Sequence, residues 1–402
     1  MYVYIAVASL VVLVLKFLLT PDPDPVCGVY VKPGKWFTLK YYAFLLLLKL
    51  RQRRNAANAE RAGYGVRSRN SAQEMDRAQS LPPSHPKAVD AVYFNGGNGE
   101  GCYFVGATAR RHKNIVQTLL YIRFPDLGLL ELTTLPDTSL QGTEEGTFAA
   151  GGLKFEAVKP MQTWNLTFDG NMRIVRTGEI KHVRFLLVWT ATTDYFDFDT
   201  DMENHALAQA IARERWTRTF FDALKVAHQT HYEQFGRISG TVHIEGVGEK
   251  QLDVQGVRDH SYGNIRDWKD LHRYCIQYIQ LEDGTAVCFG LICFPKTMSR
   301  LLIGYVFHPD GRKDMVSSTD FEFIKFGQDG HPPDVFNCRF TAAKKTYALR
   351  CEVVDQAHFF IGDGRDARIH ERLCKFTVNG VTGWGISEWD YRHNAFHPDH
   401  FE

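Results

Sequence analysis

Charged and aromatic side chains are concentrated between Gly256 and Trp268, in the order Gly-Val-Arg-Asp-His-Ser-Tyr-Gly-Asn-Ile-Arg-Asp-Trp. The flanking sequence has the pattern of β-strands, where such a density of charge indicates a buried polar network or a site. Asp259, His260 and Ser261 carry the three groups of a hydrolase triad. On a strand, however, Asp259 and Ser261 face one side and His260 the other, so they cannot form a local relay.

A buried ion pair is the simpler interpretation of this segment. Arg258 and Asp259 are expected to pair inside, or at the mouth of, a β-barrel. Gly256 and Gly263 would permit a bulge or the close approach of another backbone. The sequence leaves open whether this network serves the scaffold or a ligand.

The strands that must position these residues form two series. From Ala88 onward, short apolar runs are separated by turn residues, and 347–354 alternates apolar with mostly polar side chains, as a half-buried strand requires. Residues 199–231 break this rhythm with helical spacing. We therefore predict a mainly β chain, with two consecutive antiparallel barrels or sandwiches joined by a helix. The predicted divisions are 88–200 for the first β unit, 201–231 for the connecting helix, 232–392 for the second β unit and 393–402 for a tail.

The amino terminus has a different character. Residues 1–20 are apolar apart from Ser9, Lys16 and Thr20, which predicts a transmembrane anchor. Basic residues follow, so the positive-inside rule predicts a single-pass protein whose globular part is cytosolic. Residues 21–87 are expected to hold a helix over 36–50, lying in the membrane interface or packed on the folded body, and then a polar linker.

Composition excludes some classes of function. Lys plus Arg (47) balances Asp plus Glu (46), so no nucleic-acid partner is expected. The eight cysteines form no CxxC pair, which favours free thiols. His228, His231 and Glu233 lack the HExxH spacing of a zinc site, so we expect no metal, and no cofactor.

The motif at 256–263 resembles the G-x-R-D-x-S-[WY]-G motif of the AttH/carotenoid-hydratase-like proteins, whose fold is a tandem lipocalin-type β-barrel and to which tocopherol cyclase is distantly related. The chain is most similar to one branch, the amino-terminal region of invertebrate phosphoenolpyruvate-synthase-like (prodigiosin-synthesising-transferase-like) proteins. The similar blocks are Tyr93-Phe94-Asn95-Gly96, Ala107-Thr108-Ala109-Arg110-Arg111-His112, Leu135-Pro136-Asp137-Thr138-Ser139, 228–236 and Lys375-Phe376-Thr377-Val378-Asn379-Gly380. No ATP-grasp or phosphohistidine segment follows, so the resemblance implies at most an accessory part of a phosphotransferase.

Three functions are compatible with this resemblance. The first is a membrane-anchored lipocalin-like protein that binds a lipid or isoprenoid-like ligand in a barrel. The second is a hydratase or cyclase acting on an isoprenoid alkene, with Asp259, kept protonated by burial, as first candidate for the acid, followed by Asp267, Glu233 and Glu388. The third is a module that docks on a phosphotransferase partner. An open apolar barrel interior favours the first two functions, and a filled interior favours the third. The expected ligand-binding residues are Arg258, Asp259, His260, Tyr262, Arg266, Trp268, Tyr274 and Trp384.

Overall fold

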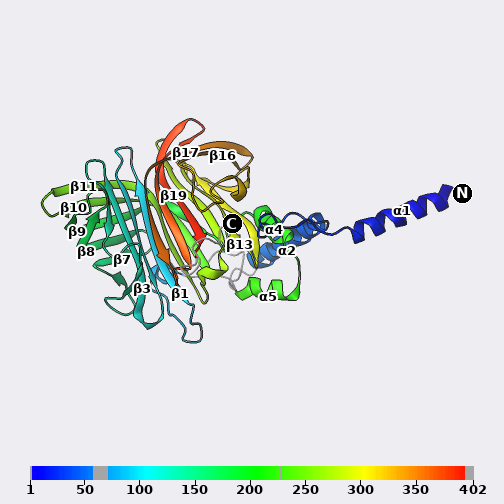
Figure 1. Ribbon diagram of the computed structural model, residues 1–402, viewed down its shortest axis with the longest axis horizontal. Coiled ribbons are helices and arrows are strands. Elements are labelled where there is room, and N and C mark those ends of the chain that lie inside the picture. The colour runs from blue at the N-terminus through cyan, green and yellow to red at the C-terminus, as the bar shows by residue number, and fades with distance from the viewer. Residues whose placement is uncertain (1, 58–70, 227–228, 394–402) are drawn as a thin grey trace.

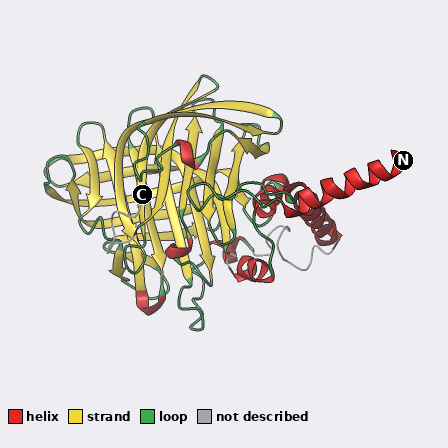
Figure 2. Ribbon diagram, turned by 45° about the vertical axis from the view of Figure 1, so that its right-hand side comes forward, coloured by secondary structure: helices red, strands yellow, loops and turns green. Residues whose placement is uncertain are grey.

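The computed structural model describes residues 2–57, 71–226 and 229–393, and these form a mainly β protein (Figure 2). Its strands are divided between one sheet and one barrel, which lie side by side (Figure 1). The greater part of the predicted tail, and residues 58–70 of the predicted linker, lie outside the described residues.

The first sheet contains the strands β1 (Val89–Gly97), β2 (Tyr103–Arg110), β3 (Ile115–Phe124), β4 (Gly128–Leu132), β5 (Ser139–Gln141), β6 (Phe148–Ala150), β7 (Leu153–Lys159), β8 (Thr163–Ile174), β9 (Ile180–Asp197), β10 (Thr230–Ile244) and β11 (Gly248–Gly263). They follow the order β4-β3-β2-β1-β11-β10-β9-β8-β7-β6, and an additional pairing of β4 with β8 makes the sheet curl round on itself. β10 and β11 lie between β9 and β1, so the predicted division at residue 232, which assigns them to the second β unit, is wrong. Their antiparallel ladders with β9 and β1 hold them in the first sheet.

The second unit is a closed antiparallel barrel of the strands β12 (Arg273–Leu281), β13 (Ala286–Phe294), β14 (Met298–Phe307), β15 (Lys313–Thr319), β16 (Val335–Ala342), β17 (Lys345–Ile361), β18 (Ala367–Val378) and β19 (Val381–Arg392). Its interior is packed with aromatic rings. Phe289 stacks on Phe340 at 5.0 Å between centroids, and Phe336 meets Trp389 edge-on at 5.8 Å. Such dense packing of large side chains makes this interior a core.

The inner face of the first sheet is likewise lined by large buried side chains. Phe94 stacks on Phe155 and meets the indoles of Trp164 and Trp189 edge-on. All four of these side chains are at most 2% exposed. The two β units thus present filled interiors, which do not match the predicted ligand-holding lumen. By the criterion stated above, a filled interior favours the docking module, so a small ligand would have to bind outside the two interiors.

The helices are α1 (Tyr2–Leu19), α2 (Phe37–Ala57), α3 (Ala72–Asp76), α4 (Asn204–Arg213) and α5 (Arg218–Val226), with the short 3₁₀ turns η1 (His112–Asn114), η2 (Trp268–Asp270) and η3 (Phe323–Lys325). Helices α4 and α5 connect β9 to β10, which are both strands of the first sheet. They therefore do not join the two β units, contrary to the prediction from the sequence. Together with α2 they lie beyond the barrel, on the side away from the first sheet (Figure 1).

Helix α2 packs on the folded body, which is the second of the two predicted placements. Tyr41 Oη lies 2.5 Å from His205 Nδ1 of α4, and Lys40 Nζ donates to the backbone oxygen of Glu214 at 2.6 Å. The predicted transmembrane anchor is not supported, because none of the helices within the described ranges combines the length and the apolar character that crossing a bilayer requires.

The two β units meet through the outer faces of β1–β3, β10 and β11 on the first sheet and of β12, β14 and β17–β19 on the barrel. Tyr103 Oη donates to the backbone oxygen of Cys374 at 2.9 Å, and Tyr121 Oη donates to that of His358 at 3.1 Å. Apolar residues of both units belong to one continuous core. We call this contact region the seam.

Candidate functional site

Strand β11 divides the polar residues of the 256–268 segment between two networks. Arg258 and His260 point to the inner face of the first sheet, whereas Asp259 points to the seam. The predicted pairing of Arg258 with Asp259 is therefore wrong, because successive residues on a strand face opposite sides. For the same reason no Asp-His-Ser relay forms here.

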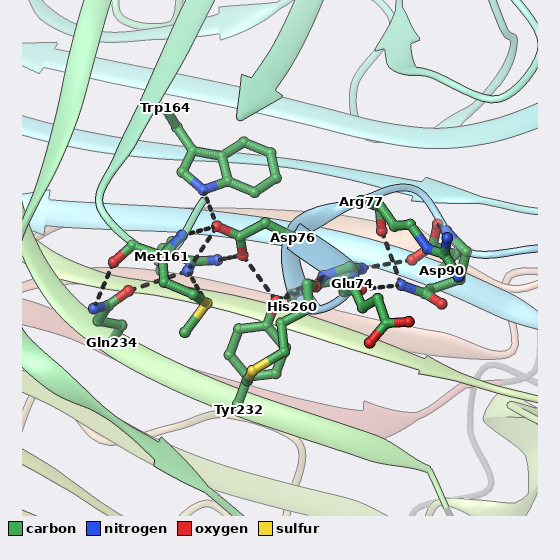
Figure 3. Close-up of polar contacts among 12 residues, drawn as sticks. Glu74, Asp76, Arg77, Asp90, Met161, Trp164, Tyr232, Gln234 and His260 are labelled. Carbon is green, nitrogen blue, oxygen red and sulfur yellow. Dashed lines mark hydrogen bonds and ion pairs between the residues drawn. The ribbon is translucent and has the colours of Figure 1, made fainter. Parts of the chain in front are cut away.

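The inner network is centred on the ion pair of Arg258 with Asp76, and Figure 3 shows Asp76 with Trp164, Tyr232 and Gln234 around it. The guanidinium lies 2.9 Å from the carboxylate of Asp76 and donates to Gln234 Oε1 at 3.0 Å. It is surrounded by the rings of Trp164, Trp189 and Tyr232, with centroids 5.1–5.4 Å away. The ion pair is almost fully buried, although among the described residues Nε and Nη1 of Arg258 have no hydrogen-bond partner.

Asp76 reaches this place because α3 ends against the sheet. The helix begins with a capping box. The backbone amide of Glu74 donates to the Ser71 hydroxyl, and the backbone amide of Ser71 donates to the Glu74 carboxylate. Asp76 Oδ2 then accepts from the indole Nε1 of Trp164 at 3.1 Å. The short helix thus positions a carboxylate inside the sheet (Figure 3).

His260 continues the inner network. Its Nε2 lies 2.6 Å from Asp90 Oδ1, and its Nδ1 lies 2.7 Å from the backbone oxygen of Met75. Asp90 also forms an ion pair with Arg110. These contacts join β1, β2, β11 and α3. We therefore interpret the inner network as part of the scaffold.

The second network lies at the seam and consists of carboxyl and phenol groups. Glu233 of β10 is fully buried, and its Oε2 accepts from Tyr305 Oη of the barrel at 2.6 Å. Its Oε1 accepts from His231 Nε2 at 3.1 Å and lies 3.5 Å from Tyr278 Oη. Side chains of both β units thus meet at one carboxylate.

Two more carboxyl groups enter the seam from β18 and β19. Tyr93 Oη of β1 donates to Glu371 Oε2 at 3.1 Å, and Tyr274 donates to Glu388. Within the described part of the chain, Glu371 Oε1 is buried without a hydrogen-bond partner, as are both carboxyl oxygens of Asp390. Buried oxygens of this kind call for a proton, a water or a ligand group.

The seam residues also influence one another electrostatically. Burial raises the pKa of Asp259 to about 6, assisted by the charge of Glu233 and opposed by His231. Burial, with the charges of Asp259 and Glu233, raises the pKa of Glu388 to about 7, although Tyr274 donates to it. Burial also raises the pKa of Glu371 well above its ordinary value. Asp259 and Glu388 nevertheless remain partly exposed, so exchange with solvent is open to both.

His231 balances part of this negative charge. Burial lowers the pKa of the imidazole, but the hydrogen bond to Glu233 and the charge of Asp259 outweigh that effect, so the pKa of His231 is raised. The side chain is 27% exposed. A histidine, an aspartic acid and two glutamic acids thus adjoin where the two β units meet, a grouping typical of acid–base sites.

The structure brings together three of the four carboxyl groups named from the sequence, Asp259, Glu233 and Glu388, which interact by charge. Tyr274 and Arg266 join them, since Arg266 interacts with Asp259 and donates to Gln229 at 2.7 Å.

The other named residues lie apart from these. Asp267 accepts from the Lys269 amide at 3.1 Å and so caps η2, which begins with Trp268. Tyr262 contacts the ring of His260 at 5.1 Å. Trp384 packs over Gly99, at the far end of β19 from Glu388. Whether any of these side chains binds a ligand stays a prediction.

Several seam residues were not found from the sequence, namely Tyr93, Tyr278, Tyr305, Glu371 and Asp390. One signal was available for Glu371, which shares a strand face with the apolar Ile369 and Leu373. Within the ranges that the structure describes, no group of three metal-ligating side chains is suitably placed for a metal ion, and His228 lies outside those ranges.

Comparison with solved structures identifies the same two-part β fold elsewhere. A protein assigned as AttH from Nitrosomonas europaea is 11% identical, with a TM-score of 0.50, covering 79% of this chain and 97% of the other. CghA with Sch210972 (13% identical, TM-score 0.49, 79% and 93%) and kievitone hydratase from Nectria haematococca (9% identical, TM-score 0.47, 82% and 97%) are also similar. At 11% identity, the similarity to the AttH protein shows a shared fold and nothing more.

The predicted AttH-like fold is thus supported, and the predicted relation to phosphoenolpyruvate-synthase-like proteins is not. No curated protein matches the sequence. The bilayer, the cytosolic placement and the phosphotransferase partner stay predictions. One family model does cover residues 4–391, from α1 through both β units to the end of β19, so the chain belongs to the family of unknown function DUF8627.

Proposed function

We propose that the protein binds an apolar, unsaturated small molecule at the seam and catalyses an acid-initiated addition to its double bond, of the hydratase or cyclase type. The observation that carries this proposal is the placement of Asp259, a partly exposed carboxyl group that lies opposite Glu233 on the seam face of β11, where burial raises its pKa to about 6. A general acid works best when its pKa is close to the ambient pH.

The proposed step conserves atoms and charge. The carboxylic acid form of Asp259 transfers its proton to one carbon of the alkene and leaves a carbocation on the other. Water, or a hydroxyl group of the ligand itself, bonds to that carbon and releases its own proton to a carboxylate. The net result is the addition of water, or ring closure without change of composition.

The surroundings of Asp259 suit a cationic intermediate. Glu233 and Glu388 provide negative charge, and the rings of Tyr93 and Tyr278, with centroids 6.2 Å apart, provide electron-rich faces. Apolar residues of the shared core surround the cluster, which limits premature capture of a cation by water. A protein that only binds the ligand would use the same seam. The experiment below distinguishes binding alone from binding with catalysis.

The experiment has two readouts on the full chain. Native mass spectrometry after purification identifies co-purifying apolar molecules, and these, with related alkenes, are then incubated with the protein in D₂O. Carbon-bound deuterium together with a gain of one water, or with ring closure, is the expected result. Asp259→Asn is expected to abolish deuterium incorporation and to retain ligand uptake.

Glu249→Gln, which alters an exposed carboxylate on the same strand, serves as the control and should retain both properties. Ligand uptake without any deuterium incorporation by the native sequence would reduce the function to binding. Unchanged turnover in Asp259→Asn would exclude this residue as the acid.

A further inference from the structure

A second polar site lies on the side of the barrel that faces α2 and α4, away from the seam. It is a pocket of about 210 Å³ between the segment that joins α1 to α2, the end of α4, strand β14 and the turn η3. Its charged lining residues are Lys32, Arg213, Arg300 and Glu322. The lining therefore has three basic side chains and one acidic side chain.

The single carboxylate in the lining is already engaged. Glu322 forms a two-pronged ion pair with Arg300, with Nε to Oε2 at 3.0 Å and Nη2 to Oε1 at 2.8 Å. The nearby Glu214 accepts from the hydroxyl and the amide of Ser299 at 2.7 and 2.8 Å and adds a second negative charge near Arg213, so three basic groups face two acidic ones.

Arg213 is left with unused donors. Among the residues that the structure describes, its buried Nε has no hydrogen-bond partner, and its Nη1 donates to the backbone oxygen of Val31 over a long 3.4 Å. Burial, the largest effect, and the charge of Arg300 lower the pKa of Arg213, and the charges of Glu322 and Glu214 offset this only in part. Arg300 is already paired with Glu322, so an oxyanion in the pocket would chiefly supply the acceptor that Arg213 lacks.

We propose that this pocket binds a phosphate-class oxyanion, held by Arg213 and Arg300 with Lys32 at the rim. The planar donor edge of a guanidinium matches phosphate oxygens, and Lys32, which is exposed, adds a positive charge. Tyr30 and Phe323, stacked at 5.6 Å, supply an apolar wall, which suits an organic phosphate. This proposal does not depend on the function proposed for the seam.

The phosphoryl group can come from a soluble molecule or from a lipid. The lipid source is worth testing because α2 presents Leu39, Tyr42, Leu46 and Leu50 on one face, each more than half exposed. The shared chemistry is the same in both cases, so the experiment uses probes of both kinds.

Calorimetry with inorganic phosphate and pyrophosphate, and flotation with vesicles of phosphatidylcholine alone or with added phosphatidic acid, are carried out on the full chain. Arg213→Gln is expected to weaken binding roughly tenfold or more, and Arg213→Lys by less. Arg215→Gln, which alters an exposed arginine two residues away, is the matched control and should bind as the native sequence does.

Each outcome is informative. Arg213-dependent binding of phosphate or pyrophosphate identifies a soluble ligand, and Arg213-dependent flotation only with phosphatidic acid identifies a lipid headgroup. Equal losses in Arg213→Gln and Arg215→Gln would show general attraction to positive charge and overturn the proposal, as would a lack of binding to every probe. Thermal unfolding of each variant checks that the fold is retained.

Discussion

Arg258 and Asp259 are neighbours on β11, yet their side chains belong to different networks on opposite faces of the first sheet. Arg258 forms a buried ion pair with Asp76, a residue of α3, whereas Asp259 interacts with His231 and Glu233 at the seam. The same strand therefore contributes to the scaffold with one residue and to the candidate site with the next. This separation allows the two roles to be tested independently.

Removal of the Asp76 charge should strongly destabilise the first sheet. Asp76→Asn keeps the shape of the side chain but leaves the guanidinium of Arg258 buried without a carboxylate, which typically costs about 3–5 kcal/mol. The free energy of unfolding, measured with urea, is expected to fall by about this amount. Glu74→Gln changes the capping box of the same helix and should cost about 1 kcal/mol or less. Equal losses in the two variants would contradict a special role for the ion pair.

The mainly β fold could be predicted in outline, because the alternation of apolar and polar side chains and the turn residues between strands are local features of the sequence. The division between the two units could not, since 232–263 has the same local pattern whichever sheet it joins. Its place is fixed by ladders with β9 and β1, which are pairings between segments far apart in the sequence. The role of Asp76 was out of reach for the same reason, because α3 lies in a polar stretch that reads as a linker.

Two tyrosines at Glu233 provide a matched pair of variants. Tyr305 donates to its carboxylate at 2.6 Å, whereas Tyr278 lies at 3.5 Å from it, and both rings are buried. Tyr305→Phe is therefore expected to lower the free energy of unfolding by about 2 kcal/mol, since hydrogen bonds to charged groups contribute more than neutral ones. Tyr278→Phe should cost less than about 1 kcal/mol. A larger loss in Tyr278→Phe would contradict this ranking of the two contacts.

The raised pKa of Glu388 predicts a pH-dependent stability. The pKa is about 7 in the folded protein and 4.5 in the reference state, so its contribution is complete below about pH 4 and is lost as the pH rises through 7. Such a shift corresponds to about 3 kcal/mol, which partial exposure to solvent reduces to on the order of 1–2 kcal/mol.

Glu388→Gln removes the titrating group and retains an acceptor for Tyr274. Its melting temperature should therefore exceed that of the native sequence at pH 8, with the difference vanishing near pH 4. Glu249→Gln, at an exposed position, should show no such trend. A constant difference between Glu388→Gln and the native sequence at every pH would argue against a shifted pKa.

Part of the candidate site was predictable, because carboxylates on otherwise apolar strands stand out in a sequence. Asp259, Asp267, Glu233 and Glu388 were named as candidate proton donors of a hydratase or cyclase, and the structure brings together all of them except Asp267. Tyr93 and Tyr305 were not named, since a tyrosine in a strand is most often a core residue. Only the docking of one β unit on the other determines that their hydroxyl groups meet carboxylates there.

The two glycines that flank the central motif should differ in their tolerance of a methyl group. A Cβ on Gly256 would lie 2.2 Å from the backbone oxygen of Asn95 and 2.5 Å from the Cα of Gly96, so β1 would have to move away from β11. A Cβ on Gly263 would lie 2.8 Å from Cγ of Gln229, a side chain that can move.

Gly256→Ala is therefore expected to lower the free energy of unfolding by about 3 kcal/mol, and Gly263→Ala by about 1 kcal/mol or less. Urea unfolding of both variants measures the difference. Because the β1–β11 ladder carries Tyr93 opposite Asp259, a shift of β1 in Gly256→Ala should also weaken ligand uptake at the seam. Equal stability of the two alanine variants would show that the close approach of β1 to Gly256 does not constrain the fold.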